Sequence, residues 1–205
     1  MTTAFSISDG RFLVNLARTA IAEYLSKGKV IEPPAECPKH LLEKSGVFVT
    51  LNSTKPTKQL RGCIGYPLPT EPLAVATIRS AIEAATGDPR FEPVELPEFK
   101  DSVSVEVSVL TVPEELAATE PTERPKEIQI GRDGLIVGRG GRRGLLLPQV
   151  APEWEWDAEE FLGHCCLKAG LPPDAWLEKN TCVEKFQAVV FEENKPNGEV
   201  RLKQV

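Results

Sequence analysis

The sequence lacks a long apolar run, a basic leader and a surplus of positive charge. None of its 205 residues falls in an apolar stretch of about 18 residues, so no membrane span is expected. Its start, MTTAFSISDG, lacks the basic residues and apolar run of a signal peptide. With 24 Lys and Arg against 30 Asp and Glu, the net charge of −6 disfavours nucleic-acid binding, which depends on cations contacting phosphates. We therefore expect a cytoplasmic protein.

Histidines and paired cysteines are also scarce. The two histidines are His40 and His164, and the odd count of 5 cysteines suits reduced thiols in a cytosol better than disulfides. His164 precedes Cys165 and Cys166, but adjacent cysteines on a helix point about 100° apart and no Cys-x-x-Cys partner is present. Core packing is favoured there, and we expect no metal and no cofactor.

Familiar phosphate-binding and hydrolase signatures are missing as well. The chain has neither a G-x-x-x-x-G-K-[S/T] loop nor a G-x-S-x-G elbow. The segment GRGGRRG, 138–144, contains G-x-G but has Arg143 where the dinucleotide pattern needs glycine. A hairpin turn with exposed arginines is the favoured interpretation. RNA binding through Arg139, Arg142 and Arg143 is the weaker alternative.

The apolar periodicities that are present predict an α+β fold. Helices are expected at 9–27, beginning after Ser8 and ending at Gly28, and also at 71–87 and 157–170. Residues 88–101 are expected to be irregular. Antiparallel strands with about three packing helices argue for one domain over residues 1–205. The expected strands are 46–52, 102–110, 127–131, 134–139, 144–149 and two near the C-terminus.

The segment 102–110, SVSVEVSVL, alternates strictly between valine and polar residues. Val103, Val105, Val107 and Val109 are expected in the core, with the polar residues on the opposite side. Glu106 stands out among the serines. It is either part of a solvated face or a carboxylate that lines a cleft.

The hexapeptide LRGCIG, 60–65, is the candidate site. In an extended strand Arg61 and Cys63 project to the same side, about 7 Å apart, and the guanidinium would favour the nucleophilic thiolate. Gly62 and Gly65 would leave backbone N–H groups open to a ligand. The alternative is a tightly packed strand with glycines where a helix crosses.

A second cluster lies in GDPRFEP, 87–93. Asp88 and Arg90 follow a helix end, in a loop that Pro89 and Pro93 stiffen. Charged loop residues beside rigid positions are often functional. A purely structural Asp88–Arg90 pair is the equally weighted alternative.

Together these segments resemble the AMMECR domain family. The matching blocks are GVFVTL, LRGCIG, DPRFEP, VEVSVLT, DGLIV, GLLLPQVA and FLGHCCLKAGL, with Trp176 beyond, and LRGCIG is the hallmark. The resemblance covers residues 8–193 and implies a compact α+β protein with an antiparallel sheet and a cleft between a larger and a smaller lobe. It implies no established activity. Some relatives are fused to Memo-type and radical-SAM domains, which suggests partners of those kinds in a modification pathway.

Two hypotheses follow for function. In the first, Cys63 is a nucleophile or a ligand-binding thiol for a small anionic or acyl-type ligand, and Arg61 and Arg90 hold its negative charge. Gly62 and Gly65 would then offer N–H groups, and Asp88 or Glu106 would orient Arg61 or act as a base. In the second, the protein is a non-catalytic binding or adaptor module, and LRGCIG shapes a pocket for a peptide or a protein partner.

Overall fold

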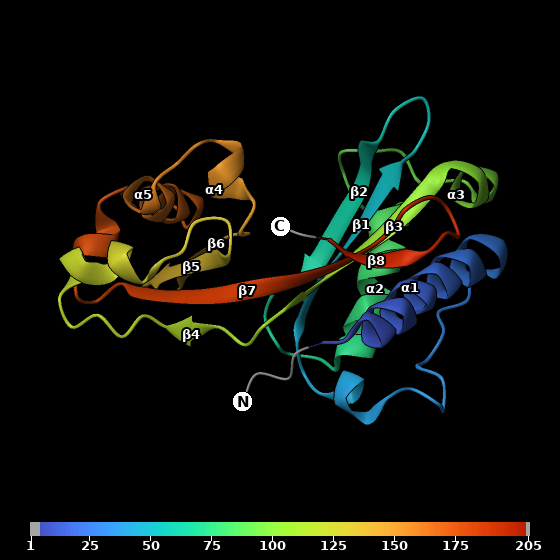
Figure 1. Cartoon of the computed structure of the whole chain (residues 1–205), viewed down its shortest axis with the longest axis horizontal. Helices are drawn as coiled ribbons and strands as arrows, with labels where there is room; N and C mark the ends of the chain where they lie inside the picture. Colours follow the sequence, from blue (N-terminus) through green and yellow to red (C-terminus); the bar gives the residue numbers. More distant parts are fainter. Residues whose placement is uncertain (1–4, 204–205) are drawn as a thin grey trace. The chain divides into compact units, whose positions relative to one another are not determined.

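The computed structural model describes residues 5–203 and divides into two compact units (Figure 1). Unit 1 takes its described residues from 5–110 and 189–203, and unit 2 is Thr111–Ala188. Strand β7, Cys182–Glu193, begins in unit 2 and ends in unit 1. The elements are helices and antiparallel strands, and three helices exceed ten residues, which confirms the predicted α+β class.

Helix α1, Ile7–Lys27, shows how local signals set an element's ends. The Ser6 side chain caps the first turn, and the Asp9 carboxylate accepts a hydrogen bond from the Ser6 N–H at 2.8 Å. The N-cap of the helix is therefore Ser6 and not the predicted Ser8. It ends at Gly28, which has the left-handed φ of 65° that glycine adopts freely.

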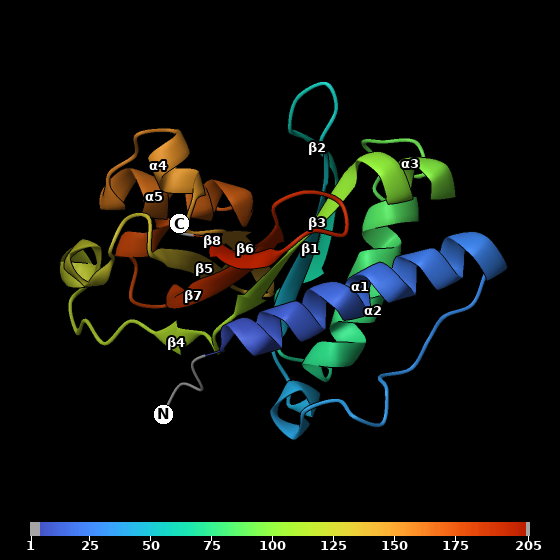
Figure 2. The ribbon, with the colours of Figure 1, turned by 45° about the vertical axis from the view of Figure 1, so that its right-hand side comes forward.

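In the sheet of unit 1, β1 lies between β2 and β3, and α1 and α2 lie side by side on one face (Figures 1 and 2). Odd-numbered apolar residues of β1 and β3 pack against these helices, and Val103, Val105, Val107 and Val109 are fully buried, as the alternation predicts. Strands β7 and β8 pair antiparallel from Val190 to Glu193. The remaining elements of unit 1 are η1 (Lys39–Leu42), β1 (Gly46–Ser53), β2 (Gln59–Tyr66), α2 (Leu73–Thr86), α3 (Leu96–Ser102), β3 (Val103–Leu110) and β8 (Val200–Lys203).

Unit 2 is built on the strand order β6-β5-β7, with β4 also paired to β7. Gly140 and Gly141, with φ of 56° and 81°, turn the chain between β5 and β6, so GRGGRRG is the predicted hairpin. A capping box at Asp157 begins α5, in agreement with the helix predicted from residue 157. The elements are β4 (Glu114–Glu115), η2 (Pro121–Glu127), β5 (Asp133–Arg139), β6 (Arg142–Leu146), α4 (Val150–Glu153), α5 (Ala158–Lys168) and η3 (Ala175–Leu177).

Two predicted segments are wrong. The strand expected at 127–131 is a turn that follows η2, because the Asp133 carboxylate accepts the Gln129 N–H at 2.9 Å and the Asp133 N–H donates to the Gln129 carbonyl at 2.9 Å. The irregular stretch expected at 88–101 contains the start of helix α3, whose Phe99 is buried. Such a short helix is held by tertiary packing, which periodicity does not reveal.

Across residues 5–203, no helix combines the length and the apolar character that a membrane span requires.

Candidate functional site

The candidate site is the face of the unit 1 sheet that points away from α1 and α2. Thr50 lies opposite Cys63 in the β1–β2 register and opposite Glu106 in the β1–β3 register, so the three residues form one row across three strands. Ser104 and Ser108 flank Glu106 on β3 and are also buried. We call this surface the Cys63 face; it consists of Thr50, Asn52, Cys63, Ser104, Glu106 and Ser108.

The Cys63 thiol is half-buried and has a hydrogen-bonded partner. The Thr50 hydroxyl donates to the Cys63 Sγ at 3.2 Å. Burial raises the pKa of the Cys63 thiol above its ordinary value; Thr50 and Arg90 act against this, and the carboxylates of Glu106 and Asp88 add to it. The raised pKa favours the neutral thiol of Cys63 at physiological pH, whereas the sequence analysis expected a thiolate favoured by Arg61.

Asp88 and Arg90 clamp the backbone of Cys63. Strand β2 is at the end of the strand order, so the outward backbone groups of Cys63 have no neighbouring strand. The Cys63 N–H donates to Asp88 Oδ2 at 2.8 Å, and the Arg90 Nη2 donates to the Cys63 carbonyl at 3.3 Å. The two side chains also pair with each other, with Arg90 Nη2 2.7 Å from Asp88 Oδ2. They thus take the place of a missing strand and fix the position of Cys63.

This clamp makes Asp88 a strongly acidic, buried carboxyl. Its side chain is only 2% exposed, whereas that of Arg90 is 54% exposed. The hydrogen bonds from the Arg90 side chain, opposed by burial and aided by the Cys63 N–H, hold the pKa of Asp88 far below its usual range. Asp88 is therefore ionised at physiological pH, which makes it a positioning group and a poor base.

Replacement of Asp88 by Asn is expected to lower the free energy of unfolding by about 2–3 kcal/mol at pH 7, because charge-assisted hydrogen bonds are lost. A depressed folded-state pKa contributes stability that is present above the unfolded pKa of about 4 and is lost as pH falls further. The difference between wild type and Asp88→Asn should be constant from about pH 5 to 8 and shrink below about pH 4. Urea unfolding over this range measures it.

The control is Asp101→Asn, since Asp101 is exposed and a surface change of this kind should stay within about 0.5 kcal/mol. An Asp88→Asn difference that does not depend on pH would contradict the assigned ionisation.

Arg61 is engaged away from the thiol. The β1–β2 register shifts between Leu51 and Asn52, because Gly62 pairs with Leu51 while Leu60 pairs with Asn52. Arg61 is the extra residue of this bulge, and a bulge breaks the alternation on which the expected Arg61–Cys63 proximity rested. Its guanidinium donates to Glu98 Oε1 at 2.7 Å and to the Glu92 carbonyl at 2.8 Å.

The two glycines of LRGCIG allow close packing. A Cβ on Gly62 would lie 2.1 Å from the carbonyl oxygen of Ala84 in α2, so only glycine lets this helix approach. Because the backbone groups of Cys63 point outward, those of Gly62 point toward β1 and are used in the ladder. A Cβ on Gly65 would lie 2.3 Å from the Phe48 ring. For Gly62 the geometry supports the alternative in which a helix crosses the strand.

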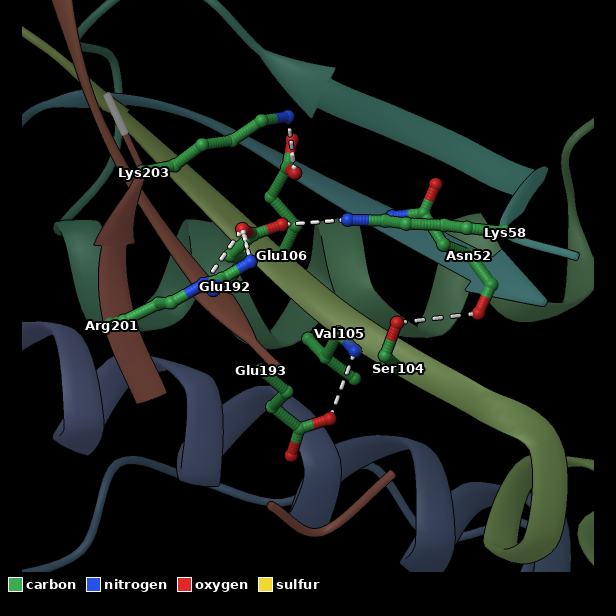
Figure 3. Close-up of polar contacts among 9 residues, drawn as sticks. All are labelled: Asn52, Lys58, Ser104, Val105, Glu106, Glu192, Glu193, Arg201 and Lys203. Atoms are coloured by element: carbon green, nitrogen blue, oxygen red, sulfur yellow. Dashed lines mark hydrogen bonds and ion pairs between the residues drawn. The ribbon is translucent and has the colours of Figure 1, made fainter. Parts of the chain in front are cut away.

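Buried carboxylates and exposed cations extend the Cys63 face toward β7 and β8 (Figure 3). Lys203 Nζ lies 2.9 Å from Glu106 Oε2, and Lys58 and Arg201 reach Glu192 at 2.6 and 2.9 Å. Lys203 and Arg201 are two residues apart on β8, which puts both on the same face of the sheet. These five side chains therefore form two ion-pair groups on this face: Lys203 with Glu106, and Lys58 and Arg201 with Glu192.

The other sequence candidates lie elsewhere. In unit 2, Arg139 pairs with Glu178 at 2.5 Å, Arg143 pairs with Glu184, and Arg142 donates to the Gly170 carbonyl at 2.8 Å, so these arginines have partners within their own unit. His40 bonds Asp9 on α1, and His164 stacks on Trp156. Among residues 5–203, no cluster of three or more His, Cys, Asp and Glu could hold a metal ion.

Sequence reasoning missed Thr50 and the partners of the glutamates. The alternation in GVFVTLN placed Thr50 opposite the valines, but the pairing that brings it to Cys63 is a register between strands. Lys58, Glu192, Arg201 and Lys203 carry no local signal, since they meet Glu106 or each other only through the paired strands.

Comparisons with known proteins agree on one family. The AMMECR1 family model matches residues 14–191. The chain is 60% identical over 196 residues to Protein PYRAB00100 of Pyrococcus abyssi, with 95% of each chain covered. It is likewise 60% identical over 196 residues to Protein PF1979 of Pyrococcus furiosus, covering 95% of this chain and 92% of the relative.

The fold also matches a solved structure. The crystal structure of uncharacterized protein PH0010 from Pyrococcus horikoshii superposes with a TM-score of 0.86 at 57% identity, covering 96% of this chain and 97% of that one. The family model spans most of the sequence, and the relatives match it over nearly its whole length. The chain belongs to the AMMECR1 family.

Proposed function

We propose that the Cys63 face binds a small anionic ligand, with Cys63 as a neutral thiol in contact with it. The observation that carries this proposal is the difference in burial between the carboxylates and the cations on this face. The side chains of Glu106 and Glu192 are 10% and 6% exposed, whereas those of Lys203, Lys58 and Arg201 are 42%, 49% and 65% exposed. The carboxylates are buried and the cations are partly exposed. This surface therefore presents positive charge, although the net charge of the protein is −6.

The numbers of positive and negative side chains on this face also support an anionic ligand. Three cations face two carboxylates, because Glu192 holds both Lys58 and Arg201. One positive charge is therefore not neutralised within these two groups. A carboxylate or phosphate group would neutralise it through charge-assisted hydrogen bonds, to which partly exposed lysine and arginine are suited.

The spacing of the row limits the size of the ligand. Glu106 and Cys63 are two strands apart, which is roughly 10 Å, and Thr50 lies between them. A ligand of this length would place its anionic end at Lys203 and an acyl-type or soft end at the Cys63 sulfur. Arg90, half-exposed beside Cys63, offers a further cation at that end.

A second candidate is a cysteine-dependent acyl transfer. Two features favour it: the Thr50 hydroxyl donates to the Cys63 sulfur, and Arg90 lowers the pKa of Cys63, although burial outweighs both. In such a step the sulfur would form a thioester with an acyl ligand, and the thiol proton would pass to the departing group. The raised pKa of Cys63 favours binding over this chemistry.

Alkylation of Cys63 by iodoacetamide tests both candidates. With peptide mapping to separate the five cysteines, Cys63 should react more slowly than a free thiol at pH 7, because its pKa is raised. Succinate, inorganic phosphate and acetyl phosphate serve as probes. At least one should slow the reaction of Cys63 severalfold, and Lys203→Gln should abolish this protection. Lys27→Gln is the matched control, since Lys27 is an exposed lysine that pairs with Glu23 on α1.

The outcomes separate the alternatives. Protection that survives in Lys203→Gln would overturn the assigned anion site, and so would the absence of protection by every probe. Alkylation of Cys63 faster than a free thiol would favour the nucleophile. The release of phosphate from acetyl phosphate by wild type but not by Cys63→Ala would establish it.

A further inference from the structure

A pocket in unit 2 lies between α5 and the segment that leads through η3. Its apolar walls include Leu167, Pro173 and Leu177, and the two leucines are 52% and 43% exposed. Gly163 faces this segment, and the Cβ it lacks would lie 3.3 Å from the Pro173 carbonyl oxygen. The absence of a side chain at this position helps keep the groove open. Large aliphatic side chains are thus left in contact with water beside a hollow that could accept an apolar group.

The charged residues that line the pocket are all acidic. Glu159, Glu160 and Asp174 line it, and no lysine or arginine does. In the described part of the chain, none of these three carboxylates is in an ion pair. Glu160 accepts only the Asp157 N–H of the capping box, at 3.0 Å. The rim therefore has uncompensated negative charge.

Aromatic stacking holds one wall in position. The His164 ring lies against Trp156 with centroids 3.7 Å apart and planes 5° apart, and Trp156 stacks in turn on Trp154 at 6.0 Å. Glu160, His164 and Leu167 are spaced four and three residues apart, so they follow one another along a single stripe of α5. The stripe presents an acid, an imidazole and a leucine on a rigid helix.

We propose that this pocket is the docking site for a basic segment of another protein, in which one or two aliphatic residues enter the groove between cationic side chains. Charge complementarity selects this occupant: an apolar groove with three unpaired carboxylates repels nucleic acid and acidic peptides and attracts Lys- and Arg-rich ones. The mode is that of short peptides which anchor an apolar side chain in a groove and set their specificity by charge. The pocket shares no residue with the Cys63 face. The proposal therefore gives unit 2 a separate role in binding a partner.

A labelled peptide tests the proposal. An acetylated and amidated peptide of sequence KRLLRK, with rhodamine at one end, is titrated with the full chain and followed by fluorescence anisotropy. Binding should weaken about tenfold for KRSSRK, in which serines replace the leucines. It should disappear for EELLEE, in which glutamates replace the four cations. Higher salt should weaken binding further, because the rim charges are exposed.

Variants of the protein locate the site. The double variant Glu159→Lys, Asp174→Lys should bind KRLLRK at least tenfold more weakly, and Leu167→Ser about fivefold. The matched control is Glu43→Lys, Asp101→Lys, which changes the net charge equally at exposed acids of unit 1 and should alter binding less than twofold. Unchanged circular dichroism and unfolding midpoints verify that each variant folds.

Three results would overturn the proposal. The first is no binding of KRLLRK by wild type. The second is equal weakening by the two charge-reversed variants, which would mean general electrostatic attraction. The third is a dimer in sedimentation velocity that Leu167→Ser dissociates, since a second copy of the chain would then occupy the groove.

Discussion

Replacement of Glu193 by Ala is expected to lower the free energy of unfolding by about 3–5 kcal/mol, the range for breaking a buried ion pair. Glu193 and Arg18 are only 2% and 10% exposed. The Glu193 carboxylate accepts from Arg18 and from the Val105 N–H at 3.0 Å, and Arg18 also donates to the Val103 carbonyl at 2.6 Å. Figure 3 shows Glu193 on the opposite side of the sheet from Glu192, toward α1. Without Glu193, a guanidinium would remain buried without its counter-charge.

Urea unfolding at pH 7 measures this loss, and two further variants interpret it. The double variant Arg18→Met, Glu193→Leu should cost much less than Glu193→Ala, because apolar groups of similar size leave no buried charge. Glu199→Ala should change stability by less than about 0.5 kcal/mol, since Glu199 pairs with Arg11 at 3.9 Å and both are exposed. A cost below about 1 kcal/mol for Glu193→Ala would show that water reaches the pair.

Gly62→Ala is expected to destabilise the protein by about 3 kcal/mol, at the upper end for an overpacked site. The added Cβ would lie 2.1 Å from the Ala84 carbonyl oxygen, which is backbone in the last turn of α2, a helix that is packed against the sheet. Either α2 or β2 must shift. Because Cys63 follows Gly62 in β2, a shift of this strand should also change the alkylation rate of Cys63.

The control for this substitution is Gly138→Ala. Gly138 is also a strand residue, but its added Cβ would have ordinary contacts, the nearest at 3.6 Å. Alanine there should be neutral or stabilising by a few tenths of a kcal/mol, since it restricts the unfolded chain. Thermal or urea unfolding compares the two variants. Equal effects would mean that the cost at Gly62 reflects loss of a glycine and not a collision with α2.

The sequence alone was sufficient where the signal is local. The 3.6-residue period predicted α1, α2 and α5, and the strict alternation in β3 predicted which of its residues pack in the apolar core. Gly28 correctly marked the end of α1, and the helix predicted from residue 157 begins at Asp157. Each of these features depends on residues within a few positions of one another, where sterics and hydrogen bonds of neighbours decide the outcome.

The prediction failed where tertiary contacts outweighed the local pattern. Ile128 and Ile130 alternate like strand residues, yet the Asp133 carboxylate binds the backbone at Gln129 and closes a turn. Helix α3 is seven residues long, below the length at which a helix is stable without packing. Both segments take their conformation from groups that the linear pattern does not bring together.

For the candidate site, the sequence by itself determined that Cys63 lies in an extended stretch beside glycines, and that Asp88 and Arg90 share a loop with two prolines. Only the tertiary structure decided their roles. A bulge in β2 separates Arg61 from the thiol, α2 makes Gly62 a packing residue, and strand register brings Thr50 to the sulfur and Lys203 to Glu106. The physical reason is that periodicity sets which face of an element is buried, whereas register and helix approach set which side chains meet across elements, and those depend on the packing of the whole unit.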